Sequence, residues 1–271
     1  MAKFTLIAVI RNQAPYIVEW VAHHLALGVE HFVLCVHGSS DGTARITRRL
    51  AAMGYAAHVK LTVSDNDVKS SVLSQIGNLE EVASADWVGL LDVDQFLNSH
   101  RQHGSLRELF EHVPDTNDAI SVRCDLFGSN DVQNISDEWV TRTFSKRANR
   151  KTTKAKEPVI LARSLEALTV PQQIFEVGLN DAQVNAYRCK SAENLAVRLI
   201  TPLDQTVEEI KESWNLADRN DVEDSSIDKY RLWTERYYKT MLTDRRLHLA
   251  QQSGRDWHKD RAQTARDQRL L

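Results

Sequence analysis

The sequence predicts an α/β fold in which a mostly parallel sheet carries helices on both faces, followed by a C-terminal helical extension. Two observations support this prediction. Apolar strands alternate with helical segments between residues 4 and 92, as in βαβ units. The strands are also apolar almost throughout, which is typical of parallel sheets whose two faces are both buried.

The first half of the chain contains clear boundary signals. Phe4–Ile10 is an apolar strand, and Arg11-Asn12-Gln13 interrupts it. Pro15 opens the next helix, because proline suits the first helical turn, and Gly28 ends that helix. Further strands are expected at residues 31–36, at residues 57–63 and in the run that ends at Asp92. Further helices are expected at residues 44–53 and 70–84.

The second half is less regular. We expect a short helix at residues 106–112, a strand at 119–124, and helices at 194–199 and 207–216. From residue 228 onward, a charged helix is expected to carry one apolar stripe, formed by Tyr230, Trp233, Tyr237, Met241 and Leu242. We therefore divide the chain into a domain of residues 1–200 and a helical extension of residues 201–271. The stripe suits core packing or a homo-oligomer contact better than a membrane, since its polar face carries both acids and bases.

Composition limits the class of protein. The chain has 271 residues, of which 42% are hydrophobic and 26% charged, as in soluble globular proteins. Its net charge of -3 gives no reason to expect nucleic-acid binding. Three scattered cysteines without a Cys-x-x-Cys pair indicate reduced thiols. No run reaches the ~18 apolar residues of a membrane span, and the apolar run at residues 4–10 is too short for a signal peptide. We therefore expect a cytoplasmic protein without a transmembrane segment.

Two carboxylates one residue apart are the most informative feature. Asp92 and Asp94 end an apolar run, and on a strand residues i and i+2 point to the same side. Carboxylates held that close repel each other unless a cation lies between them. Mg²⁺ and Mn²⁺ prefer such oxygen ligands, and Mg²⁺ is often shared between carboxylates and substrate phosphates. The pair therefore predicts a divalent metal site, the alternative being a solvated strand end.

Other polar residues follow the neighbouring strands. Ligands of open α/β sheets bind at the carboxyl ends of the strands, where we expect Asn12, Asp41 and Asp65 to meet the acidic pair. Asn12 and Asp41 either contact a nucleotide or cap the helices that follow them. Gln75, on the helix before the acidic pair, either reaches a nucleotide or belongs to a solvated face. The sequence has neither a Gly-x-Gly-x-x-Gly motif nor a P-loop, which argues against dinucleotide and P-loop sites.

Two further groups of basic residues have open roles. His23 and His24 are neighbours on a helix and point about 100° apart, so they do not ligate one metal from one face, and His24 is expected to pack in the interior. Residues 141–156 contain seven Lys or Arg and no acid. This basic run either holds an anionic ligand such as a diphosphate or forms a solvated loop. Its members are Arg142, Lys146, Arg147, Arg150, Lys151, Lys154 and Lys156.

Several ordered motifs resemble the family-2-like glycosyltransferases related to family 92. The first motif is Glu19–Leu34, in which Glu-Trp is followed by His-His. The second is Ser39–Thr43, which reads Ser-Ser-Asp-Gly-Thr. The third is Asp86–Leu97, which contains Asp-Val-Asp. The match covers about residues 5–100 and extends more thinly to about residue 200 through Phe127–Ser129 and Ala186–Ser191. The resemblance implies a GT-A-like fold.

The resemblance also implies a function and a set of site residues. Such a protein would move a sugar from a UDP- or GDP-sugar to a saccharide or lipid-linked acceptor, as in polysaccharide biosynthesis, with the help of Mn²⁺ or Mg²⁺. Asp94 would be the main metal ligand, and Asp92 would reach the ribose or a metal-bound water. Asn12 and Asp41 would line the nucleotide pocket.

The sequence departs from the family pattern at four places. Its Lys-Asn-Glu reads Arg11-Asn12-Gln13, its Asp-Val-Asp-Glu-Phe has Gln95, and the Asp-Asn before the second motif reads His37-Gly38. Ala186 replaces the histidine of a His-Tyr pair. Each change removes a charge or a ligand, so the alternative is a catalytically degenerate glycosyltransferase-like binding protein. A phosphatase of the haloacid dehalogenase type is a third interpretation, but its acidic pair belongs on the first strand.

An inverting transfer also needs a carboxylate that accepts the proton of the acceptor hydroxyl. Asp131, close after Phe127–Ser129, is our candidate for this base. Other candidates among which the sequence does not choose are Asp125, Asp137, Glu138, Glu176 and Asp181. The donor sugar, the acceptor and the stereochemical outcome stay open.

Overall fold

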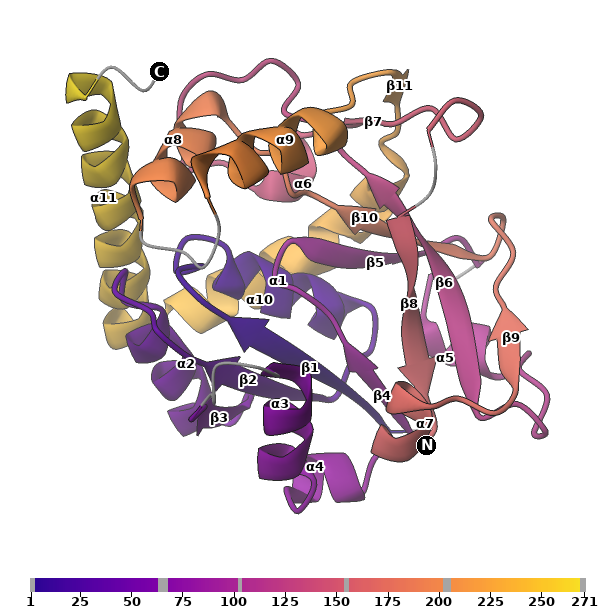
Figure 1. Ribbon diagram of the computed structural model, residues 1–271. Helices are drawn as coiled ribbons and strands as arrows, with labels where there is room; N and C mark the ends of the chain where they lie inside the picture. Colours follow the sequence, from indigo (N-terminus) through magenta and orange to yellow (C-terminus); the bar gives the residue numbers. More distant parts are fainter. Residues whose placement is uncertain (1–2, 63–67, 102–103, 154–155, 202–205, 269–271) are drawn as a thin grey trace.

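The computed structural model of the chain (Figure 1) describes residues 3–62, 68–101, 104–153, 156–201 and 206–268. Within these ranges, nine strands form one mixed sheet. They are β1 (Phe4–Ile10), β2 (His31–Val36), β3 (Ala57–Lys60), β4 (Trp87–Leu90), β5 (Gln95–Ser99), β6 (Ala119–Leu126), β8 (Lys156–Ala162), β9 (Ile174–Glu176) and β10 (Ala182–Ala186). A small second sheet joins β7 (Lys146–Arg147) to β11 (Val222–Glu223).

The large sheet has a parallel half and a mixed half, in the order β3-β2-β1-β4-β8-β6-β10-β5. The first four strands are parallel to one another. β8 runs antiparallel to both β4 and β6, β10 is parallel to β6, and β5 closes the edge antiparallel to β10. β9 lies parallel to β6 beside this path. Most pairings are parallel, so the predicted sheet type is confirmed, although the antiparallel insertion of β8 was not predicted.

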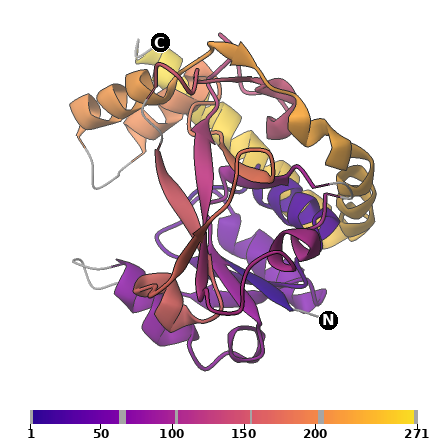
Figure 2. The ribbon, with the colours of Figure 1, turned by 90° about the vertical axis from the view of Figure 1, so that its right-hand side faces the viewer.

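Helices cover both faces of the sheet, as predicted. Leu6, Ala8 and Ile10 of β1 point into one core, and Ile7 points into the other. The first core packs against α1 (Ile17–Ala26), α2 (Thr43–Ala52) and α10 (Arg231–Leu242). The second core packs against α3 (Val68–Ile76), α4 (Glu80–Ala83) and α7 (Leu165–Thr169). Figure 2 shows the strong twist of the sheet between these layers. The other helical elements are α5 (Leu106–Phe110), α6 (Val140–Thr143), α8 (Ala192–Ile200), α9 (Val207–Ala217), η1 (Ser226–Tyr230) and α11 (Arg245–Asp267).

Two predicted helices are each divided. The helix expected at residues 70–84 is α3 and α4, because the chain turns at Gly77 and is extended at Leu79. The helix expected from residue 228 is η1, α10 and α11. Asp244 has an extended conformation, and its side chain accepts a hydrogen bond from the Leu247 N–H, so it begins a new helix. The predicted stripe is only partly buried, because Trp233 is 52% exposed.

The predicted division at residue 200 falls between α8 and α9, next to residues 202–205, which lie outside the described ranges. α11 packs against both α2 and α8, and α10 packs against α1 (Figure 1). All three cysteines are buried free thiols, as expected. Within the described residues, no helix combines the length and the apolar character needed to cross a bilayer.

The Trp-x-x-His-His motif of α1 covers β5, the strand at one edge of the sheet. The Trp20 indole N–H donates to the Gln95 carbonyl at 2.8 Å, and His23 Nε2 lies 2.7 Å from the Leu97 carbonyl. The Leu97 N–H donates to His24 Nε2 at 3.3 Å. These side chains replace the strand that would otherwise pair with β5, and they block edge-to-edge association. His24 is therefore an interior histidine, as predicted, and so is His23.

The two histidines predict a loss of stability in mild acid. Burial lowers the pKa of His23 to about 4 and that of His24 well below its usual value of 6.5. The unfolded chain therefore binds more protons, and stability is lost as the pH falls below about 6.5. For His23 alone the loss reaches about 3 kcal/mol near pH 4. Urea unfolding at a series of pH values measures this slope.

Two variants test the source of this slope. His23→Gln should flatten the pH dependence, because its amide replaces the donor without titrating. His112→Gln, at an exposed histidine just after α5, is the matched control and should give the wild-type slope. A His23→Gln protein with the wild-type slope between pH 6.5 and 4 would assign the acid sensitivity to other groups.

Candidate functional site

A cleft of about 400 Å³ opens at the carboxyl ends of β1, β2 and β4, where the sequence predicts a ligand site. α8 and α11 contribute its other walls. Arg11, Asn12 and Gln13 follow β1 at one side of the cleft. Asp92 and Asp94 follow β4. The cleft is also lined by Tyr16, His37, Arg188, Lys190, Asn194, Arg198 and His258.

The acidic pair was predicted to lie on a strand, but it lies on a turn that follows β4. β4 ends at Leu90, and the Gln95 N–H donates to the Asp92 carbonyl at 2.9 Å, which closes a four-residue turn. The side-chain oxygen of Gln95 accepts a hydrogen bond from the Asp92 N–H at 3.0 Å. The turn still brings Asp92 and Asp94 to the same cleft. The geometric argument from strand alternation was wrong, although both side chains reach the predicted place.

Asp94 has an unsatisfied oxygen. Its Oδ1 atom is buried and has no hydrogen-bond partner among the described residues. A buried carboxylate oxygen without a donor is costly, so a cation or a ligand donor is expected there. No group of three His, Cys, Asp or Glu side chains suited to a metal occurs within the described ranges. A cation bound here would therefore take its remaining ligands from water or from a bound substrate.

Basic side chains form the opposite wall of the cleft. Arg188 follows β10, Lys190 precedes α8, and Arg198 lies on α8. Burial lowers the pKa of Lys190, and the negative charge of Asp94 raises it. Burial also lowers the pKa of Arg198. The cleft thus combines a carboxylate with two desolvated cations, Lys190 and Arg198, an arrangement that suits an anionic ligand held together with a metal ion.

Lys190 is buried and, in the part of the chain that the structure describes, has no ion pair with a carboxylate. It is only 7% exposed, and its ammonium group lies 4.5 Å from the centre of the Tyr16 ring. The Tyr16 hydroxyl accepts a hydrogen bond from Asn194 at 2.7 Å. Asn194 also forms a capping box with Ser191 at the start of α8. This chain of contacts positions Lys190, and none of the described residues accepts a hydrogen bond from its ammonium group.

Asn12 lines the cleft, whereas Asp41 orders the loop beside it. Asn12 has a left-handed backbone with φ of 51°, and its side chain accepts a hydrogen bond from the Ser40 N–H at 2.8 Å. It lines the cleft and joins the end of β1 to the loop after β2. Asp41 is buried behind the wall. It accepts hydrogen bonds from the N–H groups of Ala14 and Thr43, so it orders this loop.

His258 is a cleft residue that the sequence did not indicate. It comes from α11, and its Nε2 atom lies 2.9 Å from Asp41 Oδ2. Burial would raise the pKa of Asp41, but the hydrogen bonds from His258, Thr43 and Ala14 outweigh burial and lower it. No local motif marks His258, because its partner lies more than 200 residues away in the chain.

Gly254 lets α11 approach closely enough to place His258. A Cβ atom at this position would lie 2.4 Å from the Ala14 Cβ and 3.3 Å from the Asp41 carbonyl oxygen. Gly254→Ala should gain about 1 kcal/mol of helix propensity but lose about 1–3 kcal/mol through overpacking. We expect net destabilisation, measured as a lower melting temperature, and Gly254→Val should have a larger effect. A melting temperature raised by both substitutions would show that the approach is not tight.

The other predicted site residues that the structure describes do not line the cleft. Asp131 is exposed and has φ of 59°, and it is not among the residues that line the cleft. Gln75 uses its amide to bond the Thr62 carbonyl at 3.0 Å and the Ser71 carbonyl at 2.9 Å. Asp65 lies outside the described residues. The other carboxylates considered as a base do not line the cleft either, namely Asp125, Asp137, Glu138, Glu176 and Asp181.

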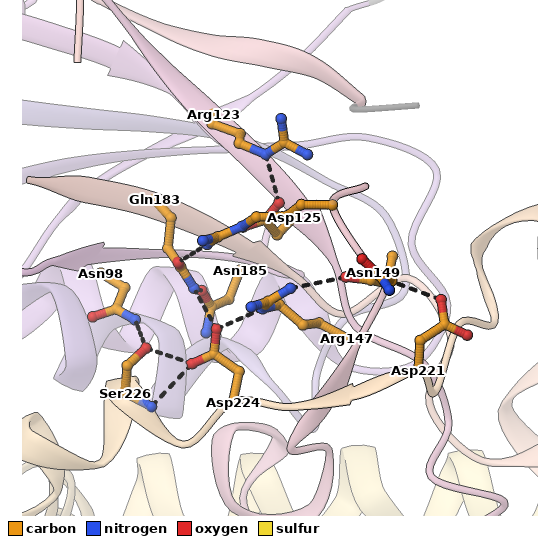
Figure 3. A network of polar contacts seen from close by, with 12 residues as sticks. Asn98, Arg123, Asp125, Arg147, Asn149, Gln183, Asn185, Asp221, Asp224 and Ser226 are labelled. Carbon is orange, nitrogen blue, oxygen red and sulfur yellow. Dashed lines mark hydrogen bonds and ion pairs between the residues drawn. The ribbon is translucent and has the colours of Figure 1, made fainter. Parts of the chain in front are cut away.

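Three arginines of the basic run pair with acids from other parts of the chain, among them Arg147 and Arg150. Arg147 bonds Asp224 at 2.7 Å, and Arg150 bonds Asp125 at 2.6 Å. Figure 3 shows the resulting network, in which Gln183 also bonds Asp224. Nothing in this network lines the cleft. Arg147 and Arg150 therefore join this part of the run to β6 and to the residue after β11 and do not line the cleft, whereas Lys151 is exposed.

Two departures from the family pattern have a structural explanation. Gln95 is buried, and its oxygen accepts the Asp92 N–H, a role that does not require a negative charge. Ala186 is fully buried in β10, opposite Gln95, and does not line the cleft. Glu19, which matches the pattern, is also buried. Its carboxylate accepts hydrogen bonds from the N–H groups of Val140 and Thr141 at the start of α6.

The fold and the cleft define an α/β protein with an acidic pair and a basic wall at the carboxyl edge of its sheet. The model of glycosyltransferase family 92 matches residues 7–237. The chain therefore belongs to glycosyltransferase family 92, and the predicted family is confirmed.

Individual relatives are more distant. A family 92 protein of Arabidopsis thaliana is 27% identical over 147 residues, and one of Ricinus communis is 25% identical over 147 residues. Each match covers 50% of this chain and 25% of the relative, so the chain spans about a quarter of the length of these curated relatives.

Among solved structures, S. aureus TarS 1–349 is similar with a TM-score of 0.43 and 13% identity, covering 98% of this chain and 91% of that chain. The same protein in complex with UDP gives a TM-score of 0.42 and 14% identity, with the same coverage.

Proposed function

We propose that the protein is a glycosyltransferase that takes a sugar from a nucleotide-sugar donor, a UDP- or GDP-sugar, with the help of a divalent metal ion. The observation that carries this proposal is that the buried Asp94 Oδ1 has no hydrogen-bond partner among the described residues and that Asp94 shares its cleft with Lys190 and Arg198. Family membership supports the transfer of a sugar. A nucleotide diphosphate has the charge and the oxygen ligands that such a cleft would bind.

The residues present fit a hard divalent cation. Asp94 offers an oxygen without a donor, and Asp92 lines the same cleft. Mg²⁺ or Mn²⁺ bound by these carboxylates would supply Lewis-acid stabilisation of the diphosphate. Two carboxylates are enough for Mg²⁺ in sites where substrate phosphates complete the coordination.

The chain's own cations would act on the leaving group. Breaking the bond between the sugar and the diphosphate leaves a negative charge on the diphosphate. Lys190 is preorganised beside Tyr16, and its desolvated ammonium group would stabilise that charge more strongly than an exposed lysine. Arg198 would contribute in the same way. Tyr16 and Asn194 act indirectly, since they hold Lys190 and the start of α8 in place.

Calorimetric titration tests this proposal directly. The full chain is titrated with UDP and with GDP, each in the presence of Mn²⁺, of Mg²⁺ and of EDTA. We expect binding of one nucleotide at least about tenfold tighter with a metal ion than with EDTA, because the cation joins the carboxylates to the diphosphate. Equal affinity with and without metal ions would contradict metal assistance.

The acceptor and the cellular setting are also proposals. A saccharide or lipid-linked acceptor, as used in polysaccharide biosynthesis, suits the family.

A cytoplasmic location stays a prediction, and so does a homo-oligomer formed through the C-terminal helices. For the latter, Leu232 and Trp233 on α10 are 75% and 52% exposed. Analytical ultracentrifugation of wild-type protein and of Leu232→Ser with Trp233→Ser measures whether this face forms a dimer.

One observation favours a second candidate, a binding protein that does not turn over its ligand. None of the six carboxylates considered as the base for an inverting transfer lines the cleft. A degenerate protein would bind a nucleotide sugar and leave it intact. Nuclear magnetic resonance of donor sugars incubated with Mn²⁺ and the protein separates the two, since a working enzyme releases free nucleotide diphosphate by slow hydrolysis or by transfer.

A further inference from the structure

A second cavity, of about 470 Å³, lies between α2 and α11 and contains four arginines. We call it the arginine groove, and it is lined by Arg45, Arg48, Arg49, Arg246, Leu249 and Ala250. It shares no residue with the cleft. Along α11, Leu249 is about 13 Å from His258 at 1.5 Å per residue. A ligand in the arginine groove would therefore occupy a site of its own.

The positive charge of the groove is poorly compensated. Arg49 bonds Asp244 through two nitrogens, at 2.8 and 2.5 Å. In the described part of the chain, Arg45, Arg48 and Arg246 have no ion pair with a carboxylate. Three positive charges therefore remain in one concave site.

Two of these arginines are oriented by neutral partners. Arg45 donates to the Ser253 hydroxyl at 2.8 Å, and Arg48 donates to the Ala44 carbonyl at 3.0 Å. Each bond uses one N–H donor of the guanidinium group, and the positive charge of that group is unchanged. Side chains that are already oriented lose less conformational freedom when they bind a ligand.

We propose that the arginine groove binds phosphate groups, separately from the cleft. Several guanidinium groups with few acids favour a ligand that carries more than one negative charge. A guanidinium fork matches two oxygens of a phosphate, and three forks match the oxygens of a phosphate chain better than one carboxylate. Leu249, 55% exposed on the same groove, would contact the apolar part of a phosphate-bearing molecule.

The first experiment titrates the full chain with inorganic tripolyphosphate by calorimetry. The test variant is Arg45→Gln with Arg48→Gln, which leaves the Arg49–Asp244 pair intact. The matched control is Arg107→Gln with Arg231→Gln, two exposed arginines outside the groove. We expect the test variant to weaken tripolyphosphate binding at least about tenfold, because charge-assisted hydrogen bonds are lost. The control should stay within about twofold of the wild type.

A substitution in the cleft distinguishes tripolyphosphate binding in the groove from binding in the cleft. In Lys190→Met the groove component of tripolyphosphate binding should remain, and adding Arg45→Gln and Arg48→Gln should abolish it. This result is independent of whether UDP binds in the cleft. Loss of all tripolyphosphate binding in Lys190→Met alone would overturn the proposal, and so would a groove variant that binds as tightly as the control.

A second experiment identifies the source of the phosphate. Wild-type and groove-variant proteins are sedimented with vesicles of phosphatidylglycerol and of phosphatidylcholine. Salt-sensitive binding to phosphatidylglycerol that the groove variant loses would assign a lipid headgroup. Groove-dependent tripolyphosphate binding without vesicle binding would assign a soluble phosphate chain. If the groove variant matches the wild type in both assays, the groove binds neither.

Discussion

Asp94→Asn is expected to lower the metal-dependent affinity for the nucleotide diphosphate by at least about 100-fold and to abolish detectable transfer. The reason is that Asp94 Oδ1 is buried and no residue in the described ranges donates a hydrogen bond to it, so its charge is available to a cation. Even residues that only orient metal ligands often change metal affinity 10–100-fold, and the loss of a ligand should reach or exceed that range. Calorimetry with UDP or GDP, with and without Mn²⁺, measures the effect.

The fold should tolerate this substitution. Asparagine has nearly the same shape, and removing an unpaired charge from a partly buried site does not break a hydrogen bond of the carboxylate. We expect the melting temperature to change by less than about 2 °C. Asp115→Asn is the matched control, since this carboxylate is fully exposed and lies outside the cleft. Full metal-dependent binding by Asp94→Asn would remove this residue from the site.

Lys190→Met is the second substitution with a large expected effect. The residue is only 7% exposed, and no carboxylate is bonded to its ammonium group among the described residues. A hydrogen bond between a charged donor and a phosphate contributes about 1.5–3 kcal/mol, so nucleotide diphosphate affinity should fall about 10- to 100-fold. Stability should be unchanged or slightly higher, because a buried charge with little compensation is removed.

The pH dependence gives Lys190 a distinct signature. Burial lowers the pKa of Lys190, so it loses its proton at a lower pH than an exposed lysine. In the wild type, diphosphate affinity should therefore weaken as the pH rises through that lowered pKa. Lys190→Met should lack this alkaline decline, whereas Lys60→Met, at an exposed lysine of β3, should keep it. If Lys190→Met shows the wild-type decline, another group in the cleft controls it.

Two of the four departures from the family pattern have less effect on the site than the sequence suggested, whereas Gln13 and His37, which belong to the other two, line the cleft. Gln95 lies behind the acidic turn and supports it with a neutral acceptor, and Ala186 is inside the sheet. Neither removes a charge from the wall of the cleft. The open question of catalysis concerns the proton acceptor, because Asp131 and the other carboxylates considered for this role lie elsewhere.

Local pattern was sufficient for the parallel half of the fold. Apolar strands separated by helical periods define βαβ units, and such units place the ends of β1, β2 and β4 at one edge. The sequence therefore predicted that Asn12 and the acidic pair share a site. It was less successful for the antiparallel insertion of β8, because a strand's partner depends on the whole chain and not on its own residues.

By itself, the sequence determined the fold class, the family and the place of Asp92 and Asp94, since these depend on short-range periodicity and on motifs that follow one another in order. Only the tertiary structure decided which charges meet. It placed Lys190 and Arg198 opposite Asp94, brought His258 from the last helix to Asp41, and paired the basic run with Asp125 and Asp224. The physical reason is that electrostatic interactions act through space, and chain reversals bring together groups that are far apart in the sequence.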